Sequence, residues 1–193
     1  MNTKNLVISG VGGQGIILLS NLISEVALSN GLDVKKSEVH GMSQRGGSVV
    51  SFVRFGEKVS SPLVPLKSAD IIVSMELMEG YRWKEYIKND GIAILNDYRL
   101  PPPAVAMGNI KYKNDIIDEL KDSGVSVYSD NLVKKAIDLG NSRTVNVILF
   151  GMLSKFLDFD EKEYITALEK KVKPKFIEIN KKAFILGKEL INN

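Results

Sequence analysis

Cysteine is absent from the 193-residue sequence, and histidine occurs once, as His40. Without thiols the chain can form no disulfide, use no thiolate nucleophile and ligate no iron–sulfur cluster by itself. A single histidine also argues against a histidine-rich zinc or iron site. We therefore predict that this polypeptide holds no metal, and that the electrons of any redox reaction travel through another protein.

Long apolar runs and a strong excess of one charge are also missing. The 26 Lys and Arg residues nearly balance the 23 Asp and Glu residues, which argues against nucleic acid or an anionic membrane surface as a partner. No stretch approaches the roughly 20 apolar residues that span a bilayer, and the amino terminus has no signal-peptide pattern. We expect a cytoplasmic protein without nucleic-acid or membrane partners.

Short, β-branched apolar runs alternate with helical patterns along the first 140 residues. This alternation is typical of a Rossmann-like α/β fold, an open, mostly parallel sheet with helices on both faces. The strand predicted at 48–55 follows its predecessor too closely for a helical crossover, so we expect it to be antiparallel or at an edge. The predicted strands cover 6–9, 34–39, 48–55, 71–73, 92–95 and 125–128, and the predicted helices cover 16–28, 77–87 and 132–139.

The last third of the chain has helical spacing at 142–157, 161–172 and 175–191. Length and 44% apolar content predict a single domain over 1–193, with an α/β core at 1–140 and a helical tail at 141–193 packed on it. The final helix places one apolar stripe toward the core. That stripe comprises Phe176, Ala183, Phe184, Gly187, Leu190 and Ile191.

A glycine-rich turn joins the first predicted strand to the first helix. Gly10 permits a tight turn, Gly12 lets the backbone approach a ligand, and Gly15 lets the helix pack close to its strand. Free N–H groups and the positive end of the helix dipole favour an anion here. We predict a phosphate or substrate site at Gly10, Gly12, Gly13, Gln14 and Gly15; the alternative is a turn that only packs helix against strand.

A dinucleotide is not favoured at this turn. Rossmann sites usually hold the ribose with an acidic residue about 20 residues further on, at the end of the second strand. Here Glu38 falls a little late and Asp33 falls before the strand.

A second informative stretch leaves the second strand at the rim that also carries the glycine turn. Loops at this rim form the ligand crevice of open α/β sheets. Arg45 could clamp a phosphate or carboxylate, and Gly46 and Gly47 expose backbone N–H groups; alternatively, Arg45 is a solvated turn residue. For His40 we favour a hydrogen-bonded strand end over a proton carrier. The predicted binding residues here are Ser43, Gln44, Arg45, Gly46 and Gly47, and no catalytic residue is assigned.

These two motifs, at 10–15 and 37–47, together with the later stretch at 180–187, resemble the gamma-type subunits of 2-oxoacid:ferredoxin oxidoreductases. The resemblance covers nearly the whole chain. The form of the second motif is most similar to the indolepyruvate branch of the family, rather than to the pyruvate or 2-oxoisovalerate gamma subunits.

The resemblance implies a subunit of an enzyme that oxidatively decarboxylates 2-oxoacids, here arylpyruvates, to acyl-coenzyme A with ferredoxin as acceptor. In such enzymes a large alpha subunit holds thiamine diphosphate, Mg and the 4Fe-4S clusters, so this chain alone should be inert. The sequence agrees, since it has neither cysteine nor a G-D-G followed about 30 residues later by N-N. The family also implies that coenzyme A is a co-substrate near this domain.

We therefore expect the glycine turn and the 44–47 loop to border the channel for the substrate or coenzyme A. The alternative is that this loop docks on the large subunit. A stand-alone NAD(P)-dependent oxidoreductase is disfavoured because no Tyr-x-x-x-Lys pair follows Tyr81 or Tyr86; a nucleotide-sensing module is a third alternative. Partner surface left bare in the isolated subunit could drive a homodimer.

Overall fold

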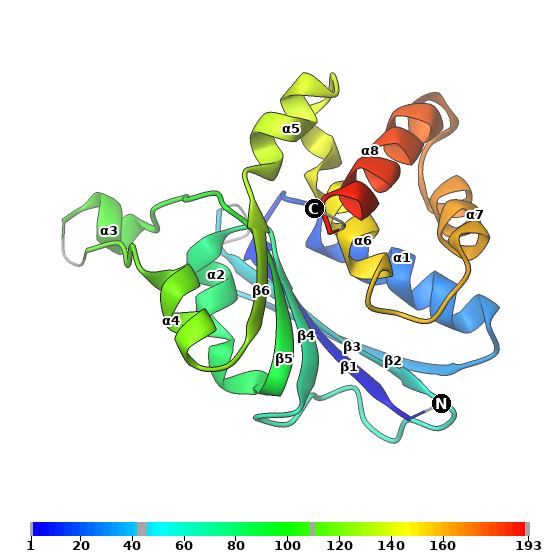
Figure 1. Cartoon of the computed structure of the whole chain (residues 1–193), viewed down its shortest axis with the longest axis horizontal. Helices are drawn as coiled ribbons and strands as arrows, with labels where there is room; N and C mark the ends of the chain where they lie inside the picture. Colours follow the sequence, from blue (N-terminus) through cyan, green and yellow to red (C-terminus); the bar gives the residue numbers. More distant parts are fainter. Residues whose placement is uncertain (1, 42–45, 109–110, 192–193) are drawn as a thin grey trace.

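The computed structural model describes residues 2–41, 46–108 and 111–191 (Figure 1). Its sheet has six strands in the order β2-β3-β1-β4-β5-β6. The strands are β1 (Lys4–Val11), β2 (Asp33–His40), β3 (Ser48–Gly56), β4 (Ala69–Ser74), β5 (Ile87–Asn96) and β6 (Ser126–Asp130).

The helices of the described residues follow the strands along the chain. They are α1 (Ile16–Ser29), α2 (Leu77–Arg82), α3 (Pro103–Ala106), α4 (Ile116–Asp122), α5 (Leu132–Asp138), α6 (Val145–Ser154), α7 (Glu161–Lys171) and α8 (Ile177–Glu189). Short 3-10 turns, η1 (Lys84–Tyr86), η2 (Ser142–Thr144) and η3 (Pro174–Phe176), connect some of them.

The predicted α/β fold class is confirmed. Strands β1, β4, β5 and β6 run parallel, whereas β3 is antiparallel to both β1 and β2. The strand expected to be antiparallel or at an edge is therefore antiparallel but internal, and β2 forms the edge. The reason is the short connection between β2 and β3, which permits only an antiparallel neighbour.

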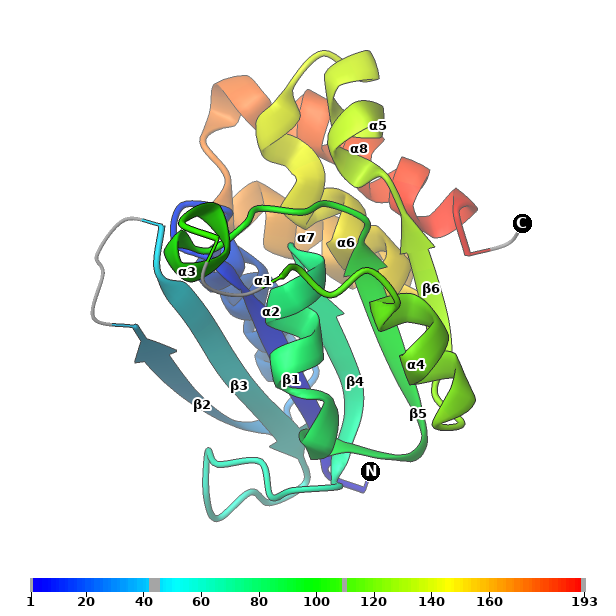
Figure 2. The same ribbon diagram turned by 90° about the vertical axis from the view of Figure 1, so that its left-hand side faces the viewer.

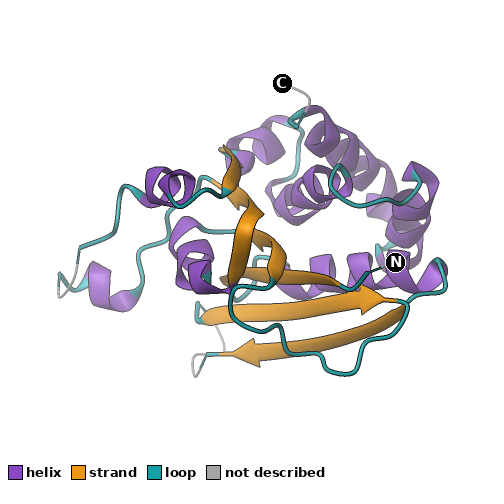
Figure 3. Ribbon diagram, turned by 60° about the horizontal axis from the view of Figure 1, so that its bottom comes forward, coloured by secondary structure: helices purple, strands orange, loops and turns teal. Residues whose placement is uncertain are grey.

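Two apolar layers cover the sheet, one on each face. Leu6 and Ile8 of β1 pack in the layer that also contains residues of α1, α5, α6, α7 and α8, whereas Val7 belongs to the layer formed with α2 and α4. This alternation is the period-two side-chain pattern of a strand that is buried on both faces. Figures 1 and 2 show α2 and α4 on one side of the sheet and α1, α6, α7 and α8 on the other, and Figure 3 shows the helices in purple around the orange strands.

The structure differs from the sequence-based expectation in several details. The helix predicted at 77–87 ends at Arg82, and Ile87 already pairs with Ala69 of β4. Helix α4 was not predicted, because its short span buries only two residues, Ile116 and Leu120. Phe176 lies in η3 before the last helix and is 38% exposed, so it does not belong to the buried stripe.

Helices α6 and α8 cross at backbone distance. A Cβ added to Gly187 would overlap the carbonyl oxygen of Ile148, and one added to Gly151 would overlap the carbonyl oxygen of Phe184. Glycine is required at both positions because the obstacle is main chain, which cannot rotate away. Around this crossing, the rings of Phe150, Tyr164 and Phe184 lie with centroids 5.2–5.6 Å apart.

Gly187→Ala should therefore push α8 off α6 and lower the free energy of unfolding by at least about 2 kcal/mol, the scale of an overpacked core. Lys182→Ala, on an exposed position of the same helix, should change it by less than about 0.5 kcal/mol. Urea denaturation of both variants measures the difference. Equal stabilities would show that the two helices separate at no cost.

An ionic cluster joins α2 to α4 on the surface. The Glu119 carboxylate accepts hydrogen bonds from Tyr81 Oη at 2.6 Å and Lys84 Nζ at 2.6 Å, and pairs with Lys113 Nζ at 2.7 Å. The Lys113 and Lys84 ammonium groups, followed by the Tyr81 hydroxyl, lower the pKa of Glu119 to about 2.

A carboxyl whose pKa is lowered on folding stabilises the protein above its unfolded pKa of about 4.3, and loses that contribution as pH falls toward about 2. Wild type should consequently be more stable than Glu119→Gln at neutral pH, and the two should converge in acid. Thermal melts of both proteins between neutral pH and about pH 2 test this expectation. They are run at low salt, because salt screens charges that are accessible to solvent. A constant difference across that range would contradict it.

Candidate functional site

The glycine turn lies between β1 and α1, at the carboxyl end of β1. Gly13 and Gly15 have φ of +98° and +90°, the left-handed region that favours glycine. Gly10, which we expected to permit the turn, is still part of β1. There a Cβ would lie 2.9 Å from Cβ of Met75, so Gly10 serves close packing against the residue that follows β4.

Gly15 also differs from its expected role. We predicted that it brings α1 close to its strand, but the nearest atom to a Cβ at Gly15 would be Asn146 Nδ2, at 2.5 Å. Asn146 lies in the first turn of α6 and its Nδ2 points at the Gly15 carbonyl oxygen at 3.4 Å. Gly15 thus allows α6 to approach the turn.

Gln14 closes the turn with its side chain. Its Oε1 accepts a hydrogen bond of 2.7 Å from the Val11 N–H, and its own N–H donates to the Val11 carbonyl at 3.1 Å. Gln14 is therefore part of the turn scaffold, as well as a residue that lines the neighbouring crevice.

The stem of the 41–47 loop is joined directly to the glycine turn. Gly12 N–H donates to the Gly47 carbonyl at 2.8 Å, and Gly41 N–H donates to the Ser48 carbonyl at 2.8 Å. Gly46 has φ of +74°. Ser43, Gln44 and Arg45 lie outside the described residues. The two sequence motifs nevertheless meet at one rim through Gly12 and Gly47.

A buried carboxylate anchors the start of β3 beside this loop. Glu79 is 6% exposed, accepts a 2.5 Å hydrogen bond from Ser48 Oγ and a 3.1 Å hydrogen bond from Arg82 Nε. Sequence analysis missed Glu79, because nothing in the local pattern of α2 distinguishes it from a solvated glutamate.

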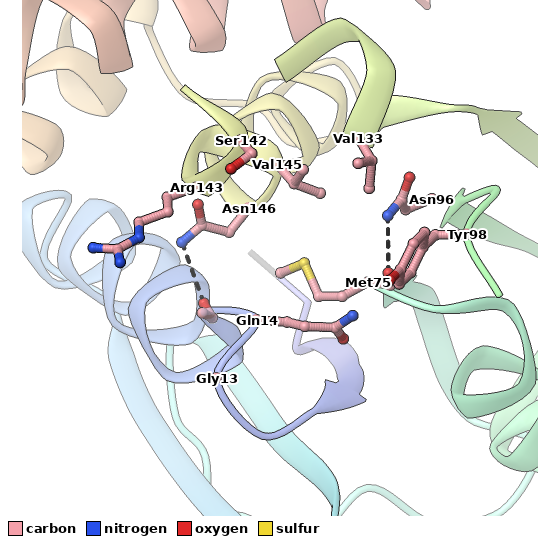
Figure 4. Close-up of a pocket in the computed structure, with 11 residues that line it drawn as sticks. Gly13, Gln14, Met75, Asn96, Tyr98, Val133, Ser142, Arg143, Val145 and Asn146 are labelled. Atoms are coloured by element: carbon pink, nitrogen blue, oxygen red, sulfur yellow. Dashed lines mark hydrogen bonds between the residues drawn. The ribbon is translucent and has the colours of Figure 1, made fainter. Parts of the chain in front are cut away.

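A crevice of about 490 Å³ opens on the other side of the turn (Figure 4). It lies at the boundary between β1 and β4, where the order of the strands reverses. From this boundary α1 leads from β1 toward β2 on one face of the sheet, and α2 leads from β4 toward β5 on the opposite face. Ligands of open α/β sheets bind at such switch points. The lining residues are Gly13, Gln14, Gly15, Met75, Asn96, Tyr98, Val133, Ser142, Arg143, Val145 and Asn146.

Two asparagines shape the crevice. Asn96 Nδ2 donates to the Met75 carbonyl at 2.9 Å and its Oδ1 accepts from the Leu132 N–H at 3.0 Å, which ties β4, β5 and α5 together. Asn146 is 3% exposed, and its Oδ1 has no hydrogen-bond partner among the described residues. Sequence analysis missed both, although Asn96 directly follows a predicted strand at the ligand rim.

Two further hollows flank the turn. One of about 380 Å³ includes Ile17 and His40, and another of about 540 Å³ includes Gly46, Gly47 and Arg82. His40, for which we favoured a hydrogen-bonded strand end, is exposed at the end of β2.

Both candidate ribose acids are paired with lysines of their own strand. Glu38 pairs with Lys36 at 2.8 Å. Asp33 lies at the far end of β2, where the Lys35 ammonium and the Val59 N–H hold its pKa below the usual range. Within residues 2–41, 46–108 and 111–191 we find no cluster of three or more His, Asp or Glu side chains suited to a metal ion, and no helix with the length and apolarity to cross a membrane.

Comparison with known proteins identifies the family. The pyruvate ferredoxin/flavodoxin oxidoreductase family matches residues 5–190, nearly the whole sequence. The chain belongs to this family. It is 41% identical to the indolepyruvate oxidoreductase subunit IorB of Thermococcus kodakarensis, over 97% of this chain and 95% of that protein. A pyruvate/ketoisovalerate oxidoreductase common gamma subunit from Pyrococcus abyssi is 28% identical over 58% of this chain and 55% of that protein.

The family resemblance inferred from the two motifs is thus confirmed, and the indolepyruvate branch fits better than the pyruvate branch. Among solved structures, the 2-oxoglutarate:ferredoxin oxidoreductase of Magnetococcus marinus, with 2-oxoglutarate, coenzyme A and succinyl-CoA bound, contains the same fold. The match has a TM-score of 0.77 and 21% identity and covers all of this chain and 31% of that one.

The difference between Gly13 and Gly15 is testable. Both substitutions to alanine incur left-handed strain of about 1–2 kcal/mol, but only Gly15→Ala also collides with Asn146. Gly15→Ala should therefore destabilise the chain more than Gly13→Ala, whose Cβ meets nothing within 4 Å. In an Asn146→Ala background, the additional loss of unfolding free energy in Gly15→Ala relative to Gly13→Ala should become smaller. Urea denaturation of the single and double variants, as a double-mutant cycle, measures this change. An unchanged additional loss would rule out the Asn146 contact as its cause.

Proposed function

We propose that this chain is the non-cluster subunit of an indolepyruvate (arylpyruvate):ferredoxin oxidoreductase, which oxidatively decarboxylates 2-oxoacids to acyl-coenzyme A. The observation that carries the proposal is the full-length similarity to an indolepyruvate oxidoreductase subunit. As a member of a 2-oxoacid oxidoreductase family, the chain works as one subunit of an enzyme. We further propose that it does so as a single domain over 1–193, in the cytoplasm.

The redox chemistry belongs to a large partner subunit in this proposal. Thiamine diphosphate with Mg would supply the carbanion chemistry of decarboxylation, and 4Fe-4S clusters would carry electrons to ferredoxin. This chain has no cysteine to hold a cluster. Its own contribution is then binding and orientation.

We assign that contribution to coenzyme A access at the rim. Gly12 and Gln14 use their N–H groups within the rim, so the proposed donors to a diphosphate are the N–H groups of Gly13 and of the first turn of α1. The Gly12–Gly47 hydrogen bond brings the second motif beside them, and the hollows around the turn offer room for the rest of an extended ligand. The bound coenzyme A of the Magnetococcus marinus enzyme supports a coenzyme A role in proteins that contain this fold. Arg45 is the proposed partner for an anionic group of coenzyme A or the 2-oxoacid.

Anaerobic affinity purification from native cells tests the subunit assignment. We expect a large, cysteine-rich thiamine protein to co-elute, with arylpyruvate-dependent ferredoxin reduction in the eluate. Isolation of the chain alone with a bound nucleotide would instead indicate a stand-alone dehydrogenase or a sensor.

Arg45→Ala in the assembled enzyme tests the binding role. Loss of a charge-assisted hydrogen bond should raise the KM for coenzyme A or for the 2-oxoacid by about tenfold. Lys58→Ala removes an exposed cation that follows β3, at the end of the strands opposite the rim, and should leave both KM values unchanged. Initial rates with one substrate varied at a time show which of the two Arg45 binds. Unchanged kinetics together with weaker assembly would assign the loop to docking on the large subunit.

A further inference from the structure

Strand β2 is an open edge of the sheet. It pairs with β3 on one side and, within the part of the chain described, with no strand on the other. None of its eight residues is buried, and Val39 is 51% exposed. Figure 2 shows its outer side facing away from the helices. An edge of this length exposes a row of unpaired backbone N–H and carbonyl groups.

Among the antiparallel registers that pair most of β2, one is self-complementary in charge. When two copies pair antiparallel across a two-fold axis at Ser37, Lys36 of one copy lies opposite Glu38 of the other, and the reverse pair forms by symmetry. Opposite charges placed directly across an antiparallel ladder stabilise it, and like charges destabilise it. Moving the axis to residue 36 would oppose two lysines, and moving it to residue 38 would oppose two glutamates.

The surroundings of these side chains suit this register. Lys36 Nζ lies 2.8 Å from Glu38 Oε1 of its own strand and donates to Asn21 Oδ1 of α1 at 2.5 Å, so both charged groups lie on the face that carries α1. In the pair, each lysine would lie between two glutamates. On the other face, the exposed Val39 would lie opposite Lys35, whose methylene stem can cover it.

We infer that β2 is a homodimer interface, in which two copies of this chain join their sheets about a two-fold axis at Ser37. Edge lysines usually prevent such pairing, but here Glu38 neutralises the repulsion in one register. Because β3 separates β2 from β1, the crevice of each copy stays open. This inference goes beyond the proposed function and does not depend on it.

The oligomeric state of the purified chain tests this interface. Sedimentation equilibrium over a wide concentration range should give twice the chain mass of 21.3 kDa. Lys36→Glu should raise the dimer dissociation constant at least about tenfold, since the substitution acts twice across the axis. The charge swap Lys36→Glu with Glu38→Lys should restore most of the affinity, and Lys162→Glu, the same charge change on the exposed surface of α7, should have no effect.

Hydrogen exchange separates this interface from other causes. Amides of β2 should exchange slowly in the wild-type dimer and faster in a folded Lys36→Glu variant. A monomeric wild type, a dimer insensitive to Lys36→Glu, or a folded charge swap that stays monomeric would overturn the proposal. So would β2 amides that are protected only after the large thiamine subunit is added, because the edge would then belong to that partner.

Discussion

Close approach of main chain at the carboxyl end of β1 is the constraint on which the rest of the structure depends. Gly10 leaves room for Met75 after β4, Gly15 leaves room for Asn146 of α6, and the Gly12 N–H bonds the Gly47 carbonyl. Side chains at Gly10 and Gly15 would separate the end of β4 and α6 from the turn. The rim is therefore assembled from distant segments because one short stretch lacks Cβ atoms.

The two-layer core holds this rim in place. Helix α6 is apolar over almost its whole circumference, with residues 146–153 all buried, because α8 crosses it at Gly151 and Gly187 while its other faces meet α1, α5 and the sheet. The position of Asn146 is consequently fixed by packing far from the turn. Interiors are packed too densely for such a helix to shift alone.

The distribution of chemistry over the chain fits a subunit that positions a ligand. The rim combines backbone donors, amide side chains and arginines, with Asn96 and Glu79 fully engaged in holding the surrounding elements. No cysteine is available for electron transfer. The proposed binding at this switch point, with redox chemistry supplied by a partner, is consistent with relatives that are oxidoreductase subunits.

Local pattern was sufficient to predict much of this structure. All six strands, the strand–glycine turn–helix unit and the shared rim of the two motifs follow from period-two apolar runs and from the direction of parallel strands. The pattern failed where tertiary pairing overrode it, as at Ile87, which joins β5 rather than continuing α2, and at α4, whose two buried residues leave too weak a signal.

The sequence by itself determined the fold class, the family and the location of the glycine turn, because each depends on residues close together in the chain. Only the tertiary structure decided what surrounds that turn. Asn146 meets Gly15 across 131 residues, and Ser48 meets Glu79 across 31. Such contacts leave no periodic trace in the sequence, since they are set by how whole helices pack on the sheet.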